Sequence, residues 1–159
     1  MTTPAERNDP LTVFCFKVVI QIGGNDRAEA YFKSVSGLKY ETEVMDYKEG
    51  GLNVSTHRLF GSTKWPNLVL KKGFTGPPHT HLLAWRRAWL DDAPNSVLKR
   101  ANGKIIQLSS DMKQMCAWKF IKGWPCKWEG PEYDASKDEL AIETLEIAHE
   151  GLIFDPSQE

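Results

Sequence analysis

The amino-acid sequence predicts a mainly β domain of antiparallel strands, with one α-helix and one long β-hairpin. The first indication is residues 12–22, where apolar and polar side chains alternate over the length of a strand. The second is residues 34–73, where two strand-like runs flank an unusually long connection. The third is that the most convincing helical spacing of apolar residues is confined to residues 79–92.

Length and composition indicate one globular domain. The chain has 159 residues, of which 41% are hydrophobic and 26% are charged, and both values are close to the averages of globular proteins. A chain of this length buries about 70% of its unfolded surface and needs no metal or disulfide to fold. We therefore expect residues 1–159 to form a single domain, with flexible ends at residues 1–10 and 154–159.

Charge and hydropathy argue against two classes of protein. The net charge is −1 and the two signs are interspersed, whereas a nucleic-acid-binding domain normally carries a basic stripe. No apolar run approaches the roughly 20 residues of a membrane span. The N-terminus lacks the basic and apolar regions of a Sec signal peptide. Three cysteines without a pairing motif indicate reduced thiols in a protein made in the cytoplasm: Cys15, Cys116 and Cys126.

Residues 12–35 predict the first hairpin. One face of the first strand is apolar and holds Phe14, Phe16, Val18, Ile20 and Ile22. The other face is less apolar and holds Cys15, Lys17 and Gln21. The turn residues at 23–26 then lead to a returning strand over residues 29–35.

Residues 34–73 predict a long hairpin with an extended tip. Along residues 38–44, Leu38, Tyr40, Thr42 and Val44 alternate with Lys39, Glu41 and Glu43, as in a strand with one covered and one exposed face. Gly50 and Gly51 break the pattern, and residues 67–72 form the returning strand, which ends at Gly73. The connection from Tyr47 to Trp65 is longer than a hairpin needs, which is typical of functional loops. The alternative is a surface loop folded back on its own domain.

The second half of the chain predicts the helix and further strands. The helix over residues 79–92 presents a stripe formed by Leu82, Trp85 and Trp89. Asn102-Gly103 predicts a tight turn between strands at residues 97–100 and 104–109, and Ser110-Asp111 predicts another turn. Residues 116–124 form a strand that continues past Pro125, through a bulge or corner, into residues 126–128.

Residues 136–152 carry two conflicting signals. Residues 136–139 match a helix capping box, and a helical stripe follows it: Ala141, Leu145, Ala148 and Leu152. Local reasoning alone therefore favours a helix that ends at Gly151. The family likeness described below implies a strand instead. We predict the strand, because packing can override local preference.

The sequence offers no persuasive catalytic set. It lacks the G-x-S-x-G, P-loop and G-x-G-x-x-G motifs. His79 and His81 form a close pair without an evident third metal ligand. His57 and His149 are isolated, and His149 is either a pH-sensitive contact or a packed neutral imidazole. We expect no catalytic, cofactor-binding or metal-binding residues.

Several segments resemble those of the tail-tube proteins, and they occur in the same order over residues 12–154. The likeness is greatest to the inner-tube proteins of extracellular phage-tail-like contractile injection systems. It is carried by Ser36-Gly37-Leu38, the acidic strand after it, residues 47–53, residues 67–73, Trp118-Lys119-Phe120, residues 124–127, Gly130-Pro131 and residues 139–152.

The resemblance implies a tail-tube or Hcp-like β-barrel of two packed antiparallel sheets, assembled into a hexameric ring. Stacked rings would form the hollow inner tube that a contracting sheath drives through a target envelope. The implied partners are other copies of the chain, the sheath, the baseplate or tube-initiator and terminator proteins, and protein cargo in the lumen. The protein would be assembled in the cytoplasm, act in a released extracellular particle or virion tail, and be a structural protein without a cofactor.

The same resemblance assigns roles to two groups of residues. The long hairpin tip would be an arm that stacks one ring on the next, with contacts from Tyr47, Lys48, Glu49, Gly50, Gly51 and Asn53. Glu41 and Glu43 are candidates for an acidic lumen lining that repels nucleic acid and acidic cargo. The alternative for these two carboxylates is an ordinary solvated strand face.

The sequence also allows two other functions. The first is a small β-rich carbohydrate- or protein-binding module, with Trp118, Trp124 and Trp128 as a stacking platform. The parity of Trp118 and Trp124 with Phe120 instead favours a core position. The second is a hydrolase that uses a cysteine and a histidine.

Overall fold

The structure is a computed structural model that describes residues 15–21, 27–51, 55–73, 85–87, 100–136 and 140–156. Several sequence predictions lie outside these residues: the flexible N-terminus, the turn at residues 23–26, the strand at residues 97–99, and most of the helix at residues 79–92. Within that predicted helix, the described residues Trp85–Arg87 are helical and Trp85 is buried in the core.

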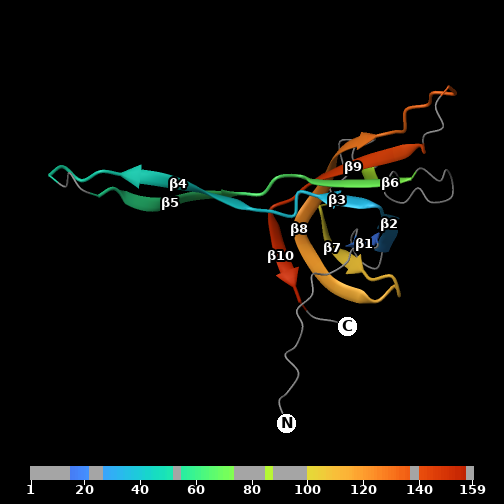
Figure 1. The fold of residues 1–159 in the computed structure, drawn as a ribbon, viewed down its shortest axis with the longest axis horizontal. Coiled ribbons are helices and arrows are strands. Elements are labelled where there is room, and N and C mark those ends of the chain that lie inside the picture. The colour runs from blue at the N-terminus through green and yellow to red at the C-terminus, as the bar shows by residue number, and fades with distance from the viewer. Residues whose placement is uncertain are drawn as a thin grey trace, which may run out of the picture.

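The described part of the chain contains ten strands, shown in Figure 1. They are β1 (Cys15–Gln21), β2 (Arg27–Phe32), β3 (Ser34–Ser36), β4 (Glu41–Tyr47), β5 (His57–Lys64), β6 (Leu68–Gly73), β7 (Ala101–Leu108), β8 (Gln114–Glu129), β9 (Ile142–Ala148) and β10 (Gly151–Asp155). Every pairing among them is antiparallel. The predicted mainly β fold is confirmed.

Eight of these strands wrap into a barrel of two packed layers. Their order is β2-β1-β7-β8-β9-β6-β3, with β10 on the other side of β8. The 16-residue β8 spans both layers, because it pairs with β7 and β10 in its first half and with β9 in its second. At the opposite corner, β2 pairs with β1 while β3 pairs with β6, and the Lys33 amide between them donates to the Lys71 carbonyl at 2.9 Å. The layers are thus joined at two corners, one within β8 and one at Lys33 between β2 and β3.

The core lies between the layers and explains the alternation in the sequence. Its buried members are Val18, Ile20, Phe32, Leu68, Leu70, Trp85, Ala101, Ile105, Phe120, Leu145, Ile147 and Leu152. Burial of a large aliphatic or aromatic side chain contributes about 1.5–3 kcal/mol, so this cluster is the main source of stability. Val18 and Ile20 lie on the face of β1 that the sequence predicts.

A second buried cluster lies on the reverse side of one layer. Val19, Ile106, Leu108 and Ala117 form it, with Cys15 packed against them. The first strand is therefore apolar on both faces at its centre, and the predicted polar face of β1 is limited to Lys17 and Gln21.

Gly103 lies inside β7 rather than in a turn, so the predicted Asn102-Gly103 turn is wrong. A Cβ at Gly103 would stand 2.1 Å from Cζ of Phe120, and the glycine is required because the aromatic ring occupies that space. The neighbouring Asn102 joins β7 to β8, because its Oδ1 accepts a hydrogen bond from the Lys122 amide at 3.0 Å.

The bend in β8 occurs next to this contact. Lys122 has a φ of 50°, which is uncommon outside glycine and asparagine, and the following Gly123 also approaches the Phe120 ring. The pairing with β9 then shifts between Pro125 and Lys127. The prediction that the strand continues past Pro125 through a bulge is confirmed. The turn predicted at Ser110-Asp111 is also confirmed, between β7 and β8.

The C-terminal segment is strand, as the resemblance implies, and the local helix signal is overridden. It differs from the prediction in forming two strands, β9 and β10, joined at His149 and Glu150. Leu145 and Ile147 alternate into the core, whereas a helix would have left β6 without its partner along β9. Phe154 and Asp155, expected in a flexible tail, belong to β10.

A nearly buried ion pair stabilises the pairing of β6 with β9. Lys72 Nζ lies 2.9 Å from Glu143 Oε1, and both side chains are 12% exposed. The second carboxylate oxygen of Glu143 accepts a hydrogen bond from Trp128 Nε1 at 3.3 Å. The Lys72 ammonium also lies 5.9 Å from the centre of the Phe32 ring, a distance at which a cation–π attraction acts.

We predict that Gly103→Ala destabilises the protein by about 1–3 kcal/mol, because the added methyl forces the Phe120 ring or the β7 backbone to move. Urea unfolding followed by tryptophan fluorescence measures the loss. The matched control is Gly50→Ala, where an added Cβ meets no atom within 4 Å. Equal unfolding midpoints for the two variants would contradict the role of the glycine.

We predict that Glu143→Gln lowers the free energy of unfolding by about 3 kcal/mol, because it leaves the Lys72 charge nearly buried without its counter-ion. Glutamine keeps the size and can still accept from Trp128. The control is Glu129→Gln at the exposed Lys127–Glu129 pair, where little change is expected. A similar change in both variants would show that burial does not set the strength of the Lys72 pair.

Candidate interaction site

A two-stranded arm projects from the barrel and is the most exposed element of the described chain. β4 and β5 pair only with each other, from Glu41↔Lys64 to Tyr47↔His57. Figure 1 shows the pair extending far beyond the barrel. Every residue of β4 is exposed. An isolated two-stranded hairpin is marginally stable in water, and no other described strand pairs with β4 or β5.

The arm leaves the barrel at a tight crossing. Gly37 has a φ of 88°, and a Cβ there would lie 2.1 Å from the carbonyl oxygen of Asn67, the residue before β6. The Lys39 amide donates to the Gly37 carbonyl at 2.8 Å, which bends the chain toward β4. The β3–β6 ladder and the β4–β5 ladder are therefore one hairpin, interrupted where it emerges from the barrel.

His149 ties the base of the arm to the barrel. Its Nε2 lies 3.2 Å from the Pro66 carbonyl oxygen, and its Nδ1 lies 3.0 Å from the Gly151 carbonyl oxygen. Both partners are carbonyl acceptors, and a neutral imidazole donates from one nitrogen only. The ring therefore lies between the segment that joins β5 to β6 and the start of β10, where its N–H donates to one of the two carbonyls. The sequence does not reveal this contact.

One ion pair and one histidine–carboxylate contact join the two halves of the arm. Arg58 Nε lies 3.7 Å from Asp46 Oδ1, and His57 Nε2 lies 3.9 Å from Glu49 Oε2. Exposed pairs of this kind contribute little to stability.

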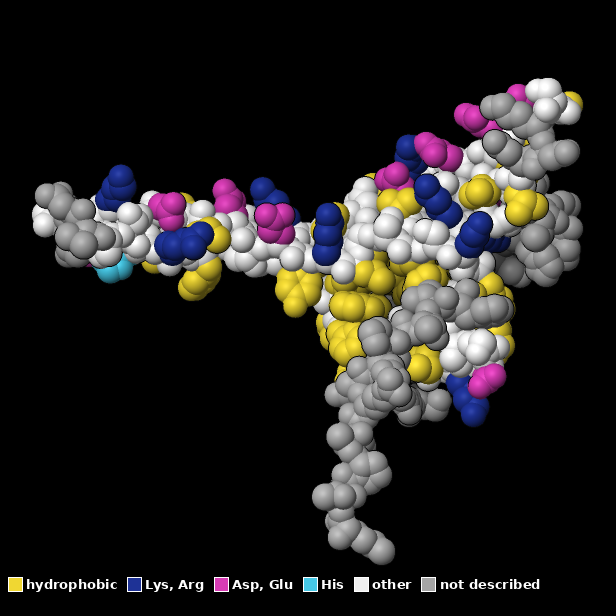
Figure 2. Space-filling model, viewed as in Figure 1, with side chains coloured by type: hydrophobic (Ala, Val, Ile, Leu, Met, Phe, Trp, Pro, Cys, Tyr) yellow, Lys and Arg dark blue, Asp and Glu magenta, His cyan; other side chains and the backbone are white. Residues whose placement is uncertain are grey.

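Large apolar side chains of the arm are exposed on both strands. Phe60 is 89% exposed, and four others are about half exposed: Val44, Met45, Tyr47 and Leu59. Figure 2 shows hydrophobic side chains along the arm and at its base. Large apolar side chains that stay exposed often mark an interaction site, so the arm is the candidate site of this chain.

The predicted arm residues lie at the far end of this element. Tyr47 ends β4, and Lys48, Glu49, Gly50 and Gly51 continue into the turn, where Gly51 has a φ of 106°. Asn53 lies outside the described residues. Glu41 and Glu43, the candidates for a lumen lining, lie on β4 within the arm and not on a strand of the barrel.

Sequence reasoning missed half of the arm. Residues 57–64, expected to be part of an irregular tip, form β5, and the returning half of the hairpin is split into β5 and β6. The expected covered face of residues 38–44 is also wrong for the single chain, where Tyr40 and Val44 are exposed. Adjacent apolar residues at Leu59 and Phe60 hide the period-two pattern, because they point to opposite faces.

The described residues offer little for catalysis. Burial raises the pKa of the Cys116 and Cys126 thiols, which disfavours the nucleophilic thiolate. In the described ranges no cluster of three metal-ligating side chains occurs, and no helix is long and apolar enough to cross a bilayer.

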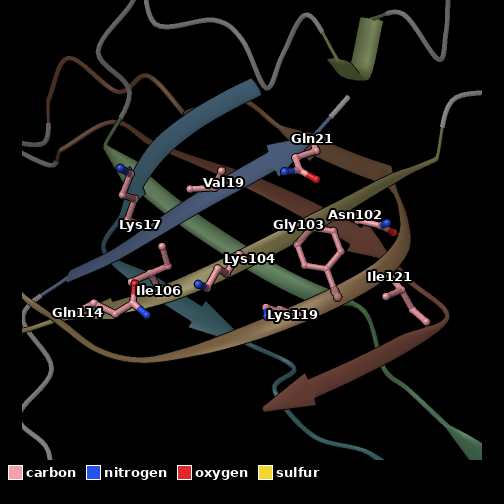
Figure 3. Close-up of a pocket in the computed structure, with 11 residues that line it drawn as sticks. Lys17, Val19, Gln21, Asn102, Gly103, Lys104, Ile106, Gln114, Lys119 and Ile121 are labelled. Atoms are coloured by element: carbon pink, nitrogen blue, oxygen red, sulfur yellow. The ribbon is translucent and has the colours of Figure 1, made fainter. Parts of the chain in front are cut away.

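A depression of about 580 Å³ on β1, β7 and β8 is lined by lysines, amides and aliphatic side chains, such as Lys17, Gln21, Lys104 and Ile106 (Figure 3).

The tryptophans do not form an exposed platform. Trp118 and Trp128 pack against the main core. The Trp118 ring lies 4.9 Å from the Phe154 ring, and the Trp128 indole donates to Glu143. The alternative of a binding module that uses these side chains is not supported.

Comparisons with known proteins agree with this architecture. The family model described as T4-like virus tail tube protein gp19 matches residues 12–153. A chain of the anti-feeding prophage baseplate has a similar structure, with a TM-score of 0.80 and 23% identity over 93% of this chain and 97% of that chain. No match was found among curated protein sequences.

Two further solved structures share the fold. A chain of the sheath-tube complex of an extracellular contractile injection system, PVC, has a TM-score of 0.76 and 19% identity, and covers 99% of this chain and 100% of that chain. A crystal structure of an Hcp protein has a TM-score of 0.54 and 9% identity over 90% and 92% of the two chains.

The family model covers the barrel and the arm together, so the family is assigned from the whole architecture and not from one motif. The family match confirms the predicted role of a structural tube subunit. This chain belongs to the T4-like virus tail tube protein family.

Proposed function

We propose that this chain is the repeating subunit of the inner tube of a contractile injection system. Hexameric rings of the chain stack into a hollow tube, which sheath contraction drives through a target envelope. The similar folds in an injection-system sheath-tube complex, a baseplate and a sheath/tube terminator support this assignment and suggest the corresponding partners. The subunits assemble in the cytoplasm and act in a released particle.

The exposed arm is the observation that carries the proposal. A free subunit leaves apolar side chains of β4 and β5 in water, and their burial on a second copy supplies the energy of stacking. Tyr47, Lys48, Glu49, Gly50, Gly51 and Asn53 form the end that reaches furthest onto the neighbouring ring.

Strand edges of the barrel supply the second contact that a tube requires. Among the described strands, β10 lies at an end of the sheet and pairs with β8. Strands at the end of a sheet can serve as templates for another chain. A heterologous contact of this kind closes a ring when the rotation per subunit allows it, while the arm acts along the tube axis.

Glu41 and Glu43 belong to the same proposal as lumen-lining residues. Both side chains are exposed, and they lie on the half of β4 nearer to the barrel. An acidic channel wall repels nucleic acid and acidic cargo and allows a protein cargo to slide. The tube requires no catalytic group and no cofactor for this role.

We predict that a variant in which residues 41–64 are replaced by a short Asn-Gly turn still forms rings but no longer forms tubes, because the barrel core lies outside the deleted segment. Negative-stain electron microscopy and sedimentation velocity distinguish the two assemblies. Tyr133→Ser, at an exposed loop residue of the barrel, serves as a control that should assemble normally. Tubes of normal length without the arm would refute its stacking role. Full-length protein that stays monomeric on preformed tube-initiating baseplates would refute the proposed function.

A further inference from the structure

His149 lies between two carbonyl groups at the corner where the arm leaves the barrel. Its Nδ1 is 3.0 Å from the Gly151 carbonyl oxygen at the start of β10, and its Nε2 is 3.2 Å from the Pro66 carbonyl oxygen between β5 and β6. Both contacts are partly buried. A carbonyl oxygen can only accept a hydrogen bond, so each ring nitrogen faces an acceptor.

The number of hydrogen bonds at this corner depends on the protonation state of the ring. A neutral imidazole carries one N–H, so it donates to one carbonyl while its other nitrogen presents a lone pair to the second carbonyl. An imidazolium carries two N–H groups and donates to both. Because a partly buried polar group without a partner costs free energy, the position of the two carbonyls favours the protonated ring.

The charged side chains at this corner pair with one another. Glu150 follows His149, and its carboxylate pairs with Lys122 on β8, 3.3 Å from Nζ, and with Arg100 just before β7. The hydrogen bond from Lys122 lowers the pKa of the Glu150 carboxyl below its ordinary value. Glu150 is therefore ionised at neutral and mildly acidic pH, and the charge of this cluster does not change there.

Neutral side chains complete the surroundings of the ring. The centre of the Phe120 ring lies 6.4 Å from the centre of the imidazole. Asn67, which follows Pro66, donates to the Cys126 sulfur at 3.5 Å, and burial raises the pKa of that thiol, so it stays protonated. A histidine ordinarily changes charge between about pH 5 and pH 8. Among these described groups, the imidazole is therefore the one that responds to mild acid.

We propose that His149 is a pH-sensitive latch, which fastens the root of the arm to the barrel when its ring is protonated. Below the pH range in which the ring loses its proton, both carbonyls are bound. Above that range, one of the two contacts is lost. The latch therefore tightens as the pH falls and loosens as the pH rises.

The latch acts where the two strands of the arm cross. Pro66 is followed by Asn67, whose carbonyl oxygen would lie 2.1 Å from a Cβ at Gly37. The other contact, at Gly151, belongs to the start of β10, which pairs with β8. Protonation thus joins the crossing to the barrel within a single chain, so this inference does not rest on the proposed tube.

Hydrogen–deuterium exchange of the full chain tests the latch. We expect the protection of amides in residues 64–68, corrected for the intrinsic effect of pH on exchange, to rise about fivefold from about pH 7.5 to about pH 5.5, because protonation adds one hydrogen bond. His149→Gln should show no such rise, since a glutamine amide has the same donors at both pH values. The matched control is His57→Gln, at the Glu49 contact far along the arm, which should keep the rise.

Both pH values are compared at a protein concentration where sedimentation velocity shows the same assembly state, so that tube growth does not contribute to protection. Unchanged protection in the unmodified protein, or an equal rise in His149→Gln, would overturn the latch.

Nitrogen NMR of protein labelled at histidine is a second measurement, because it reports the ring protons directly. The His149 signals are assigned by their loss in His149→Gln. Both ring nitrogens should carry a proton at about pH 5.5, and only one at about pH 7.5. A ring that keeps a single proton at the lower pH would also overturn the latch.

Discussion

The packing of Phe120 against two glycines is the constraint on which the barrel depends. A Cβ at Gly103 would lie 2.1 Å from this ring, and one at Gly123 would lie 2.5 Å from it. The ring therefore occupies the space between β7 and the bend of β8. Because β8 is hydrogen-bonded to β7, β9 and β10, its bend is what joins the two layers around one core.

The short link between β9 and β10 connects this bend to the arm. The Glu150 amide donates to the Ile121 carbonyl at 3.1 Å, and its carboxylate pairs with Lys122 and Arg100. The adjacent His149 contacts the Pro66 carbonyl at the base of the arm. Two consecutive residues thus hold the corner of the barrel and the root of the projecting hairpin. An interaction element is most effective when its support is rigid, and this link provides the support.

Barrel and arm differ in what stabilises them. The barrel has a buried cluster of its own, whereas the arm has cross-strand backbone bonds, exposed ion pairs and uncovered apolar side chains. A ligand that binds the folded state stabilises it by mass action. Under the proposed function that ligand is another subunit, so order in the arm and assembly of the tube are coupled.

The sequence by itself determined the strands that bury one face. Val18 with Ile20, Leu68 with Leu70, and Leu145 with Ile147 alternate because every second side chain enters the core. It also located the hairpin and the glycine turn at its tip. It did not reveal β5, because Leu59 and Phe60 are both apolar and serve opposite faces. It could not distinguish Gly103 in a strand from glycine in a turn, since the reason for that glycine is a ring 17 positions later in the chain. Only the tertiary structure decided these points. It also replaced the helical pattern of residues 141–152 with two strands. The physical reason is that β6 and β8 pair with these strands, and local preference does not encode those partners.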